Sequence, residues 1–196
     1  SLDCSSDGGV YVVGFFSNNA TFGAQTLESE NTMSTNQQYT SLFVAKYDNI
    51  GNVVWIYHPS AGHYQIAVDQ LYGPSIAVGS SAMYVAGVFK GVIEFDETTI
   101  LSSYPDSSGS RSTTDAFLVR FNLTGGLEWV ASVSGPGNED AINSIICMAD
   151  GSVTIAGNMY APTYFDVTNV RNPPIYRGQP QMYVANYNSL GAANTV

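Results

Sequence analysis

One stretch of sequence recurs three times at intervals of about 70 residues, and this repeat constrains the fold more than any other feature. Each copy contains an apolar run whose fifth residue is a glycine. The three runs are Val10–Phe16, Met83–Phe89 and Val153–Met159, with glycines Gly14, Gly87 and Gly157. A phenylalanine follows each glycine eight positions later, at Phe22, Phe95 and Phe165. Constant offsets in three copies predict three structurally equivalent units.

A second block follows in each unit and begins with an aromatic residue. The three blocks are Phe43–Asp48, Phe117–Asn122 and Tyr183–Asn188. Twelve positions after the leading aromatic, units one and two have Trp55 and Trp129, whereas unit three has Thr195. The missing tryptophan indicates that the outer strand of unit three is atypical, as expected at a cap or a junction.

Each unit is predicted to fold as four antiparallel strands. The turn sequences Asp7-Gly8-Gly9 and Asp150-Gly151-Ser152 are hairpin signals. The second strand is apolar at consecutive positions, so both of its faces must be covered. β-Branched and aromatic residues dominate the strands, and no helical periodicity is sustained, which indicates an all-β protein. Four-stranded antiparallel sheets covered on both faces are typical of β-propeller blades.

The predicted fold is therefore a partial β-propeller of three repeats. Blade one covers residues 1–57 with a truncated first strand, blade two covers 58–131, and blade three covers 132–196 with a truncated last strand. The polar connection between the second and third strands of each blade is expected to be a long loop. Propellers close with about four to eight blades, so we expect further blades of the same polypeptide, or other copies of the chain, as partners. Val12, Phe15 and Tyr183 are expected to line the open end faces.

The repeat resembles a bacterial β-propeller repeat family often called SBBP. The resemblance rests on Asp7–Gly14, Thr21–Gly23 and Phe43–Asp48, and it extends over nearly the whole chain. It implies a repeat scaffold of secreted or surface-anchored proteins and supplies no catalytic residues.

The charge balance argues against nucleic acid and membranes as partners. The formal net charge is −10, with 6 lysine and arginine residues against 16 acidic residues. A phosphate-binding surface needs cations to release counterions, and an anionic membrane surface disfavours an acidic protein. No apolar run approaches the roughly 20 residues that cross a bilayer. The low lysine content and the acidic pI favour an extracellular or cell-surface location.

No motif for catalysis, cofactor binding or metal binding is present. We interpret His58 and His63 as exposed loop residues, since zinc needs further ligands. We interpret Glu139 and Asp140 as a solvated pair of carboxylates in a loop. The candidate loop surface for glycans or proteins consists of His58, His63, Tyr104, Glu139, Asp140 and Tyr176.

Two further features concern modification and thiol chemistry. Asn19 and Asn122 begin sequons, which makes them candidate glycosylation sites. Cys4 and Cys147 occupy equivalent positions in units one and three, with Ala77 between them in unit two. Because alternate units are not neighbours in a propeller, we predict two free, buried thiols.

Three functions remain open from the sequence. The first is a non-enzymatic structural or adhesive module within a larger surface assembly. The second is a glycan- or protein-binding module that uses the long inter-strand loops. The third is part of a propeller enzyme whose site is completed by other blades.

Overall fold

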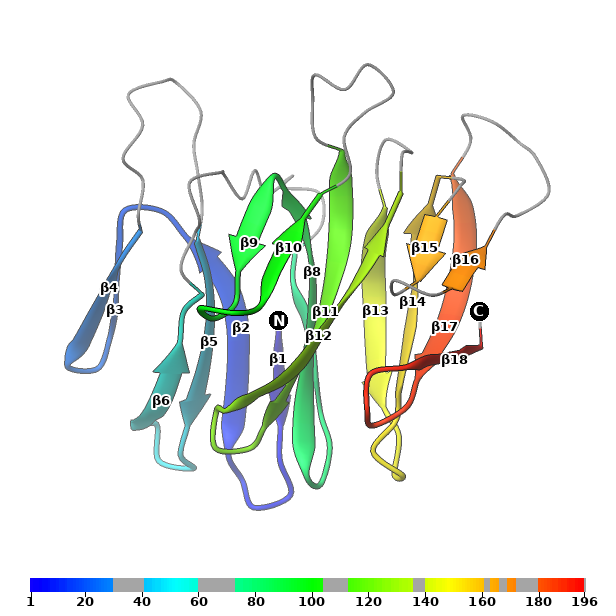
Figure 1. Cartoon of the computed structure of the whole chain (residues 1–196). Helices are drawn as coiled ribbons and strands as arrows, with labels where there is room; N and C mark the ends of the chain where they lie inside the picture. The colour runs from blue at the N-terminus through cyan, green and yellow to red at the C-terminus, as the bar shows by residue number, and fades with distance from the viewer. Residues whose placement is uncertain are drawn as a thin grey trace.

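The computed structural model describes residues 1–29, 41–59, 73–103, 113–135, 140–160, 163–165, 169–171 and 180–195. The regular elements in these ranges are β-strands, and the described residues contain no helix (Figure 1). Every strand pair is antiparallel. The predicted all-β class is confirmed.

Four strands recur in the same order in each of the three units. Unit one contains β1 (Leu2–Cys4), β2 (Val10–Phe16), β5 (Ser41–Tyr47) and β6 (Val53–Tyr57). Unit two contains β7 (Ser75–Val78), β8 (Ala82–Lys90), β11 (Thr114–Asn122) and β12 (Leu127–Ser134). Unit three contains β13 (Ala141–Cys147), β14 (Val153–Met159), β17 (Gln181–Tyr187) and β18 (Ala193–Thr195). The four strands of each unit pair in sequence order, as the repeat predicted. Strand β12 runs to Ser134, beyond the expected boundary at residue 131.

Each unit also contains a short hairpin between its second and third strands, where the sequence predicted only a loop. The hairpins are β3 (Asn19–Phe22) with β4 (Gln25–Glu28), β9 (Val92–Glu94) with β10 (Ile100–Ser102), and β15 (Thr163–Phe165) with β16 (Asn169–Arg171). The hairpin of unit three joins the outer strand of unit two through the pair Val133 and Phe165, which creates a six-stranded sheet. The hairpin of unit two lies against the outer strand of unit one, where the Tyr57 hydroxyl donates to the Phe95 carbonyl oxygen. Both of these hairpins therefore dock on the preceding unit.

The recurring glycine makes room for an aromatic ring on the next strand. Gly14, Gly87 and Gly157 pair with Phe43, Phe117 and Tyr183 at equivalent positions of the register. A β-carbon on Gly87 would lie 2.6 Å from Cζ of Phe117, closer than two carbon atoms can approach. A side chain at this position would displace the ring, which explains why glycine stands inside a strand.

The phenylalanine of each hairpin region packs on the same aromatic residue. The ring centroids are 4.7 Å apart for Phe22 and Phe43, 5.4 Å for Phe95 and Phe117, and 4.8 Å for Phe165 and Tyr183. Phe95 and Phe165 are buried, as predicted, but Phe22 is only half-buried. The prediction fails at Phe22 because, among the described residues, no preceding unit covers the β3–β4 hairpin.

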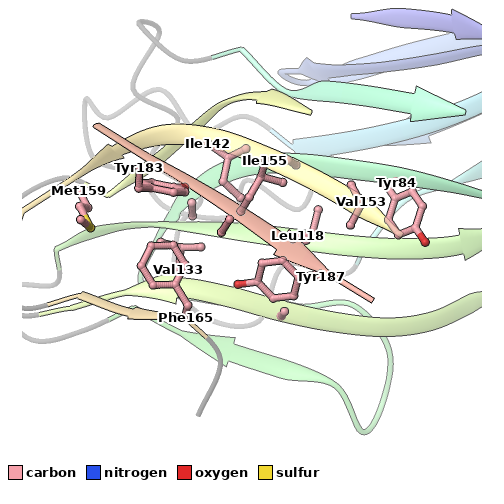
Figure 2. Close-up of a cluster of buried hydrophobic side chains, with 14 of the residues drawn as sticks. Tyr84, Leu118, Val133, Ile142, Val153, Ile155, Met159, Phe165, Tyr183 and Tyr187 are labelled. Atoms are coloured by element: carbon pink, nitrogen blue, oxygen red, sulfur yellow. The ribbon is translucent and has the colours of Figure 1, made fainter. Parts of the chain in front are cut away.

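The three units pack face to face in sequence order. Each unit has two faces. The N-side face is the one that units two and three turn toward the preceding unit, together with the equivalent face of unit one. The C-side face is the opposite one. The C-side face of unit one buries Tyr11, Val13, Leu42 and Val44 against the N-side face of unit two. The C-side face of unit two buries Tyr84, Ala86, Ala116 and Leu118 against unit three. Figure 2 shows this second interface, where side chains from both units fill the space between the sheets.

In the described part of the chain, the central unit alone is covered on both faces. Its second strand, β8, is buried at eight consecutive positions from Ala82 to Phe89. Strands β2 and β14 mostly alternate between buried and half-buried positions. The expectation that every second strand is covered on both faces is confirmed for β8. It is wrong for β2 and β14, since each has a neighbouring sheet on one side only in the described part of the chain.

Of the three residues predicted to line the end faces, Val12 lies on an outward face, whereas Phe15 and Tyr183 pack between units. Tyr183 lies on the N-side face of unit three and is buried against unit two, so that prediction is wrong. Phe15 packs against the cluster between units one and two. Val12 does lie on the outward N-side face of unit one, where it is half-buried. The outward face of unit three instead carries Met182 and Val184, which are 85% and 61% exposed.

The first strands of the three units lie side by side. The Val78 N–H donates to Asp3 Oδ2 at 2.7 Å, which links β7 to β1. The Ser75 hydroxyl donates to the Asn143 carbonyl oxygen at 3.5 Å, which links β7 to β13. The tight turns that join consecutive strands gather at the lower end of the molecule in Figure 1. None of the sheets formed by the described residues closes on itself.

Candidate functional site

A contact between tryptophan and glycine recurs at both interfaces between units. Trp55 of β6 lies over Gly125, and Trp129 of β12 lies over Gly191, each in the tight turn before the fourth strand of the next unit. A β-carbon on either glycine would lie 3.0 Å from the indole ring. These glycines have φ values of 90° and 88°, a backbone conformation that side chains disfavour. The Trp129 Nε1–H also donates to the Ser189 carbonyl oxygen at 3.1 Å. Sequence reasoning found both tryptophans but not the glycines beneath them.

A tyrosine on the C-side face of units one and two adds a second contact to the next unit. The Tyr11 hydroxyl donates to the Leu123 carbonyl oxygen at 3.4 Å, and the Tyr84 hydroxyl donates to the Gly151 carbonyl oxygen at 2.5 Å. A cation lies over each of these two rings, Lys46 Nζ at 5.0 Å and Arg120 Cζ at 5.8 Å from the centroid. The C-side faces of units one and two therefore both contact turns of the following unit, although the two tyrosines reach different turns.

One carboxyl group is buried at the junction of units two and three. The side chain of Asp140, which directly precedes β13, has no exposed surface. Its N–H donates to the Thr114 carbonyl oxygen at 2.8 Å, which ties the start of unit three to β11. Its Oδ1 accepts from the Tyr160 N–H at 2.9 Å and from the Thr163 hydroxyl at 3.2 Å. The interpretation of Asp140 as part of a solvated pair is wrong, because these partners hold it inside.

Burial raises the pKa of Asp140 to about 7. The Tyr160 N–H and the Thr163 hydroxyl oppose this rise because they stabilise the charged form, whereas the nearby carboxylate of Asp115 adds to it. Asp115 is itself buried, and its Oδ1 accepts from the Thr113 hydroxyl at 3.2 Å. Asp140 therefore exchanges its proton near neutral pH.

The hydrogen bonds of Asp140 join two units. Its Oδ2 has no hydrogen-bond partner within the described part of the chain. However, no group of three or more His, Cys, Asp or Glu side chains that could hold a metal ion occurs among the described residues. Asp140 hydrogen-bonds to Thr114 of β11 and to Thr163 in the hairpin of unit three, and it thereby holds units two and three together.

His58 is held on the sheet of unit one. Its Nδ1 lies 2.9 Å from the Leu42 carbonyl oxygen, and its ring centroid lies 5.3 Å from that of Phe16. The side chain is half-buried, so its interpretation as an exposed loop residue is wrong. The other candidates for a loop binding surface, His63, Tyr104, Glu139 and Tyr176, lie outside the described residues.

The two sequons differ in accessibility. Asn19 is exposed at the start of β3. Asn122 is half-buried, and its Oδ1 accepts from the Thr124 N–H, the Thr124 hydroxyl and the Gly126 N–H at 3.0, 2.6 and 2.9 Å. The side chain of Asn122 is thus engaged in its turn, and Asn19 is the more accessible candidate for a glycan.

Both cysteines are free thiols, but they are not buried as predicted. Cys4 is exposed and Cys147 is half-buried. The register pairs Cys4 with Val10, Val78 with Met83, and Cys147 with Val153. Val78, rather than Ala77, is therefore the equivalent position in unit two, because the tight turn between β7 and β8 is one residue shorter.

No protein-family model matches the chain, and no curated protein matches its sequence. The resemblance to SBBP repeats stays a prediction from the motifs. The described residues include no helix that could span a bilayer.

Proposed function

We propose that the chain is a non-enzymatic structural or adhesive segment of an extracellular β-propeller, with units one to three as consecutive blades. Three units, each with four antiparallel strands in sequence order, stack face to face, and their first strands lie together. Blades arranged around a common axis have this order, with the first strand innermost. The acidic, lysine-poor composition supports an extracellular location.

The observation that carries the proposal is the repetition of one interface. Trp55 over Gly125 and Trp129 over Gly191 are the same contact, made between successive units. When one surface of a unit binds a different surface of the next unit, the units form a head-to-tail series. Such a series closes into a ring when a whole number of units completes one full rotation. The constant contact is what a propeller requires of its blades.

The binding-module alternative depends mainly on His63, Tyr104, Glu139 and Tyr176. Because these residues lie outside the described ranges, a loop surface for glycans or proteins stays a prediction from the sequence. The same holds for an enzyme site completed by other blades.

Electron cryomicroscopy of the natural protein that carries this segment tests the proposal. The expected result is a closed ring in which the three units are adjacent blades with β1, β7 and β13 nearest the axis. An extended solenoid, or three sheets tumbling as separate domains, would contradict the proposal.

A further inference from the structure

The glycine beneath each tryptophan has an uncovered equivalent in unit one. Gly51 occupies the same turn position as Gly125 and Gly191, and its φ of 90° is close to their values of 90° and 88°. A β-carbon on Gly125 or Gly191 would meet an indole ring, but one on Gly51 would have no atom of the described residues within 4 Å. Within the ranges that the structure describes, unit one therefore has the receiving half of the interface with no tryptophan over it.

The rest of the N-side face of unit one keeps the apolar character of its buried equivalents. Val12 and Phe43 of unit one correspond to Val85 and Phe117 of unit two in the strand register. Val85 and Phe117 are completely buried against unit one, whereas Val12 and Phe43 are half-buried. The first strand gives the largest contrast, since Leu2 is 65% exposed and its equivalent Ile76 is 7% exposed. Apolar residues gathered on one face mark an interaction surface.

The opposite end of the series has lost the matching half of the interface. On the C-side face of unit three, Thr154 stands at the position of Tyr11 and Tyr84, and Thr195 stands at the position of Trp55 and Trp129. Asn186 likewise replaces the cations Lys46 and Arg120, and Asn158 replaces Phe15 and Val88. The C-side face of unit three therefore lacks the side chains that seat one unit on the next.

We propose that the N-side face of unit one binds one further repeat unit of the same kind, whose outer-strand tryptophan covers Gly51. That unit presents the C-side chemistry of units one and two: a buried tyrosine, small aliphatic residues and the tryptophan. A second copy of the chain does not supply this surface, because its matching faces are already covered and its free C-side face carries threonine at the tyrosine and tryptophan positions. The seating contact is therefore open at the N-side face of unit one, and the C-side face of unit three lacks the tyrosine and the tryptophan that make this contact elsewhere. This inference deepens the proposed function and rests on it only for the stacking of units in series.

Cys4 provides a reporter for occupation of this face. Its equivalent Cys147 lies against unit two, where a β-carbon on Gly79 would be 2.5 Å from the Cys147 sulfur. Cys4 is exposed. A unit that docks as unit two docks on unit three therefore covers Cys4 with its own equivalent of Gly79, and alkylation of the thiol slows.

The test is a four-unit chain in which a copy of residues 75–143 precedes Ser1. This copy contains no cysteine and places its C-side face against unit one at the offset that unit two has from unit three. Mass spectrometry of the folded protein after treatment with iodoacetamide measures the rate of alkylation of Cys4. The expected result is a decrease of roughly tenfold or more relative to the 196-residue chain, with the rate at Cys147 unchanged.

Matched variants separate docking from simple attachment. In the added copy, Tyr84→Thr with Trp129→Thr installs the residues of unit three, and the rate at Cys4 is expected to return to that of the 196-residue chain. In the four-unit chain with an unaltered copy, Val12→Asp is expected to restore the reactivity of Cys4, whereas Val184→Asp at the opposite end leaves it slow. Because Val12 and Val184 are both outside the buried cores, these two variants keep the test valid even where the double variant fails to fold.

Two outcomes overturn the inference. One is a four-unit chain in which Cys4 reacts as fast as in the 196-residue chain. The other is slower alkylation of Cys4 in the 196-residue chain as the concentration of that chain rises, together with a doubled mass in light scattering. This result would show that a second copy of the chain covers the N-side face of unit one. A ring seen by electron cryomicroscopy without protection of Cys4 overturns the docking inference only. Protection of Cys4 without a ring overturns the propeller only.

Discussion

The central unit and the two end units share one fold but differ in what surrounds them. Val85 in the second strand of unit two is completely buried, while its equivalent Val12 in unit one is half-buried. On the other face, Leu118 of unit two is completely buried, and its equivalent Val184 in unit three is 61% exposed. Similar side chains on the same sheet therefore differ in burial because of their neighbours, not because of their strands.

The two end faces differ from each other as well. The end face of unit one keeps valine and phenylalanine at the positions that are buried in unit two. The end face of unit three carries Thr154 and Asn158 on β14 where the other units have aromatic or aliphatic residues. Met182 and Val184 on this same face are 85% and 61% exposed, so the two end faces differ in the residues that seat one unit on the next and not in whether they expose apolar side chains.

The largest expected difference between the central and end units is at the hairpin phenylalanine. Phe95→Ala should lower the free energy of unfolding by about 3–5 kcal/mol, because the ring is 3% exposed and packs on Phe117. The equivalent change Phe22→Ala should cost less than about half as much, since Phe22 is half-buried. Urea unfolding of the two variants measures both values. Equal losses of stability in the two variants would show that Phe22 is as well covered in solution as Phe95, by a contact that the three described units do not make.

A pH-dependent effect is expected at the junction between the central unit and unit three. The pKa of Asp140 is about 7 in the folded chain against an ordinary value of 3.8, so between these values the folded state binds more protons than the unfolded state. Stability therefore falls as pH rises from about 4 to about 7 and does not fall further above that range. Asp140→Asn keeps the group neutral and should remove this dependence, with a gain of a few kcal/mol near neutral pH.

Urea unfolding across the same pH range measures the dependence. The control is Asp96→Asn, because Asp96 is exposed and hydrogen bonds from Thr98 and Thr99 hold its pKa below the ordinary value. This control should leave the slope between pH 4 and pH 7 unchanged. If Asp140→Asn and the unaltered chain show the same slope, the junction around Asp140 is open to water.

A smaller difference is expected at the strand glycines. Gly87→Ala should cost about 1–3 kcal/mol, because its β-carbon would meet the Phe117 ring, which Phe95 also holds in place. Gly14→Ala should cost less than about 1 kcal/mol, since the facing Phe43 ring is half-buried and has room to shift. Urea unfolding again compares the pair. A larger loss at Gly14 than at Gly87 would contradict the idea that cover from a neighbouring unit fixes these rings.

The repeat made the strands and the paired glycines predictable, because their patterns are local. The hairpins escaped prediction because their strands are only three or four residues long, too short to show a period, and Gln25–Glu28 is also mostly polar. The burial of Asp140 depends on Tyr160 and Thr163, which are 20 and 23 positions away and give no local signal. The glycine beneath each tryptophan belongs to the next unit, so only the packing of the units reveals it.

The smallest expected effect concerns the two thiols and leaves the fold unaltered. Cys4 and Cys147 occupy the same position of the first strand, one at an end of the series and one inside it. Burial raises the pKa of the Cys147 thiol, and a positive charge on Arg120 only partly offsets this. The thiolate is the reacting form, so the raised pKa slows the reaction of Cys147, which is also less accessible than Cys4.

Iodoacetamide should therefore modify Cys4 about tenfold faster than Cys147 in the folded chain at neutral pH. Mass spectrometry of the two peptides measures both rates in one sample. In urea-unfolded chain the two thiols should react at similar rates, which controls for differences in the flanking sequence. Because no residue is changed, this measurement asks whether the difference in cover exists in the natural chain. Equal rates in the folded chain would mean that unit three separates from unit two on the time scale of the reaction. The contrast between central and end faces would then hold only while the units are packed together.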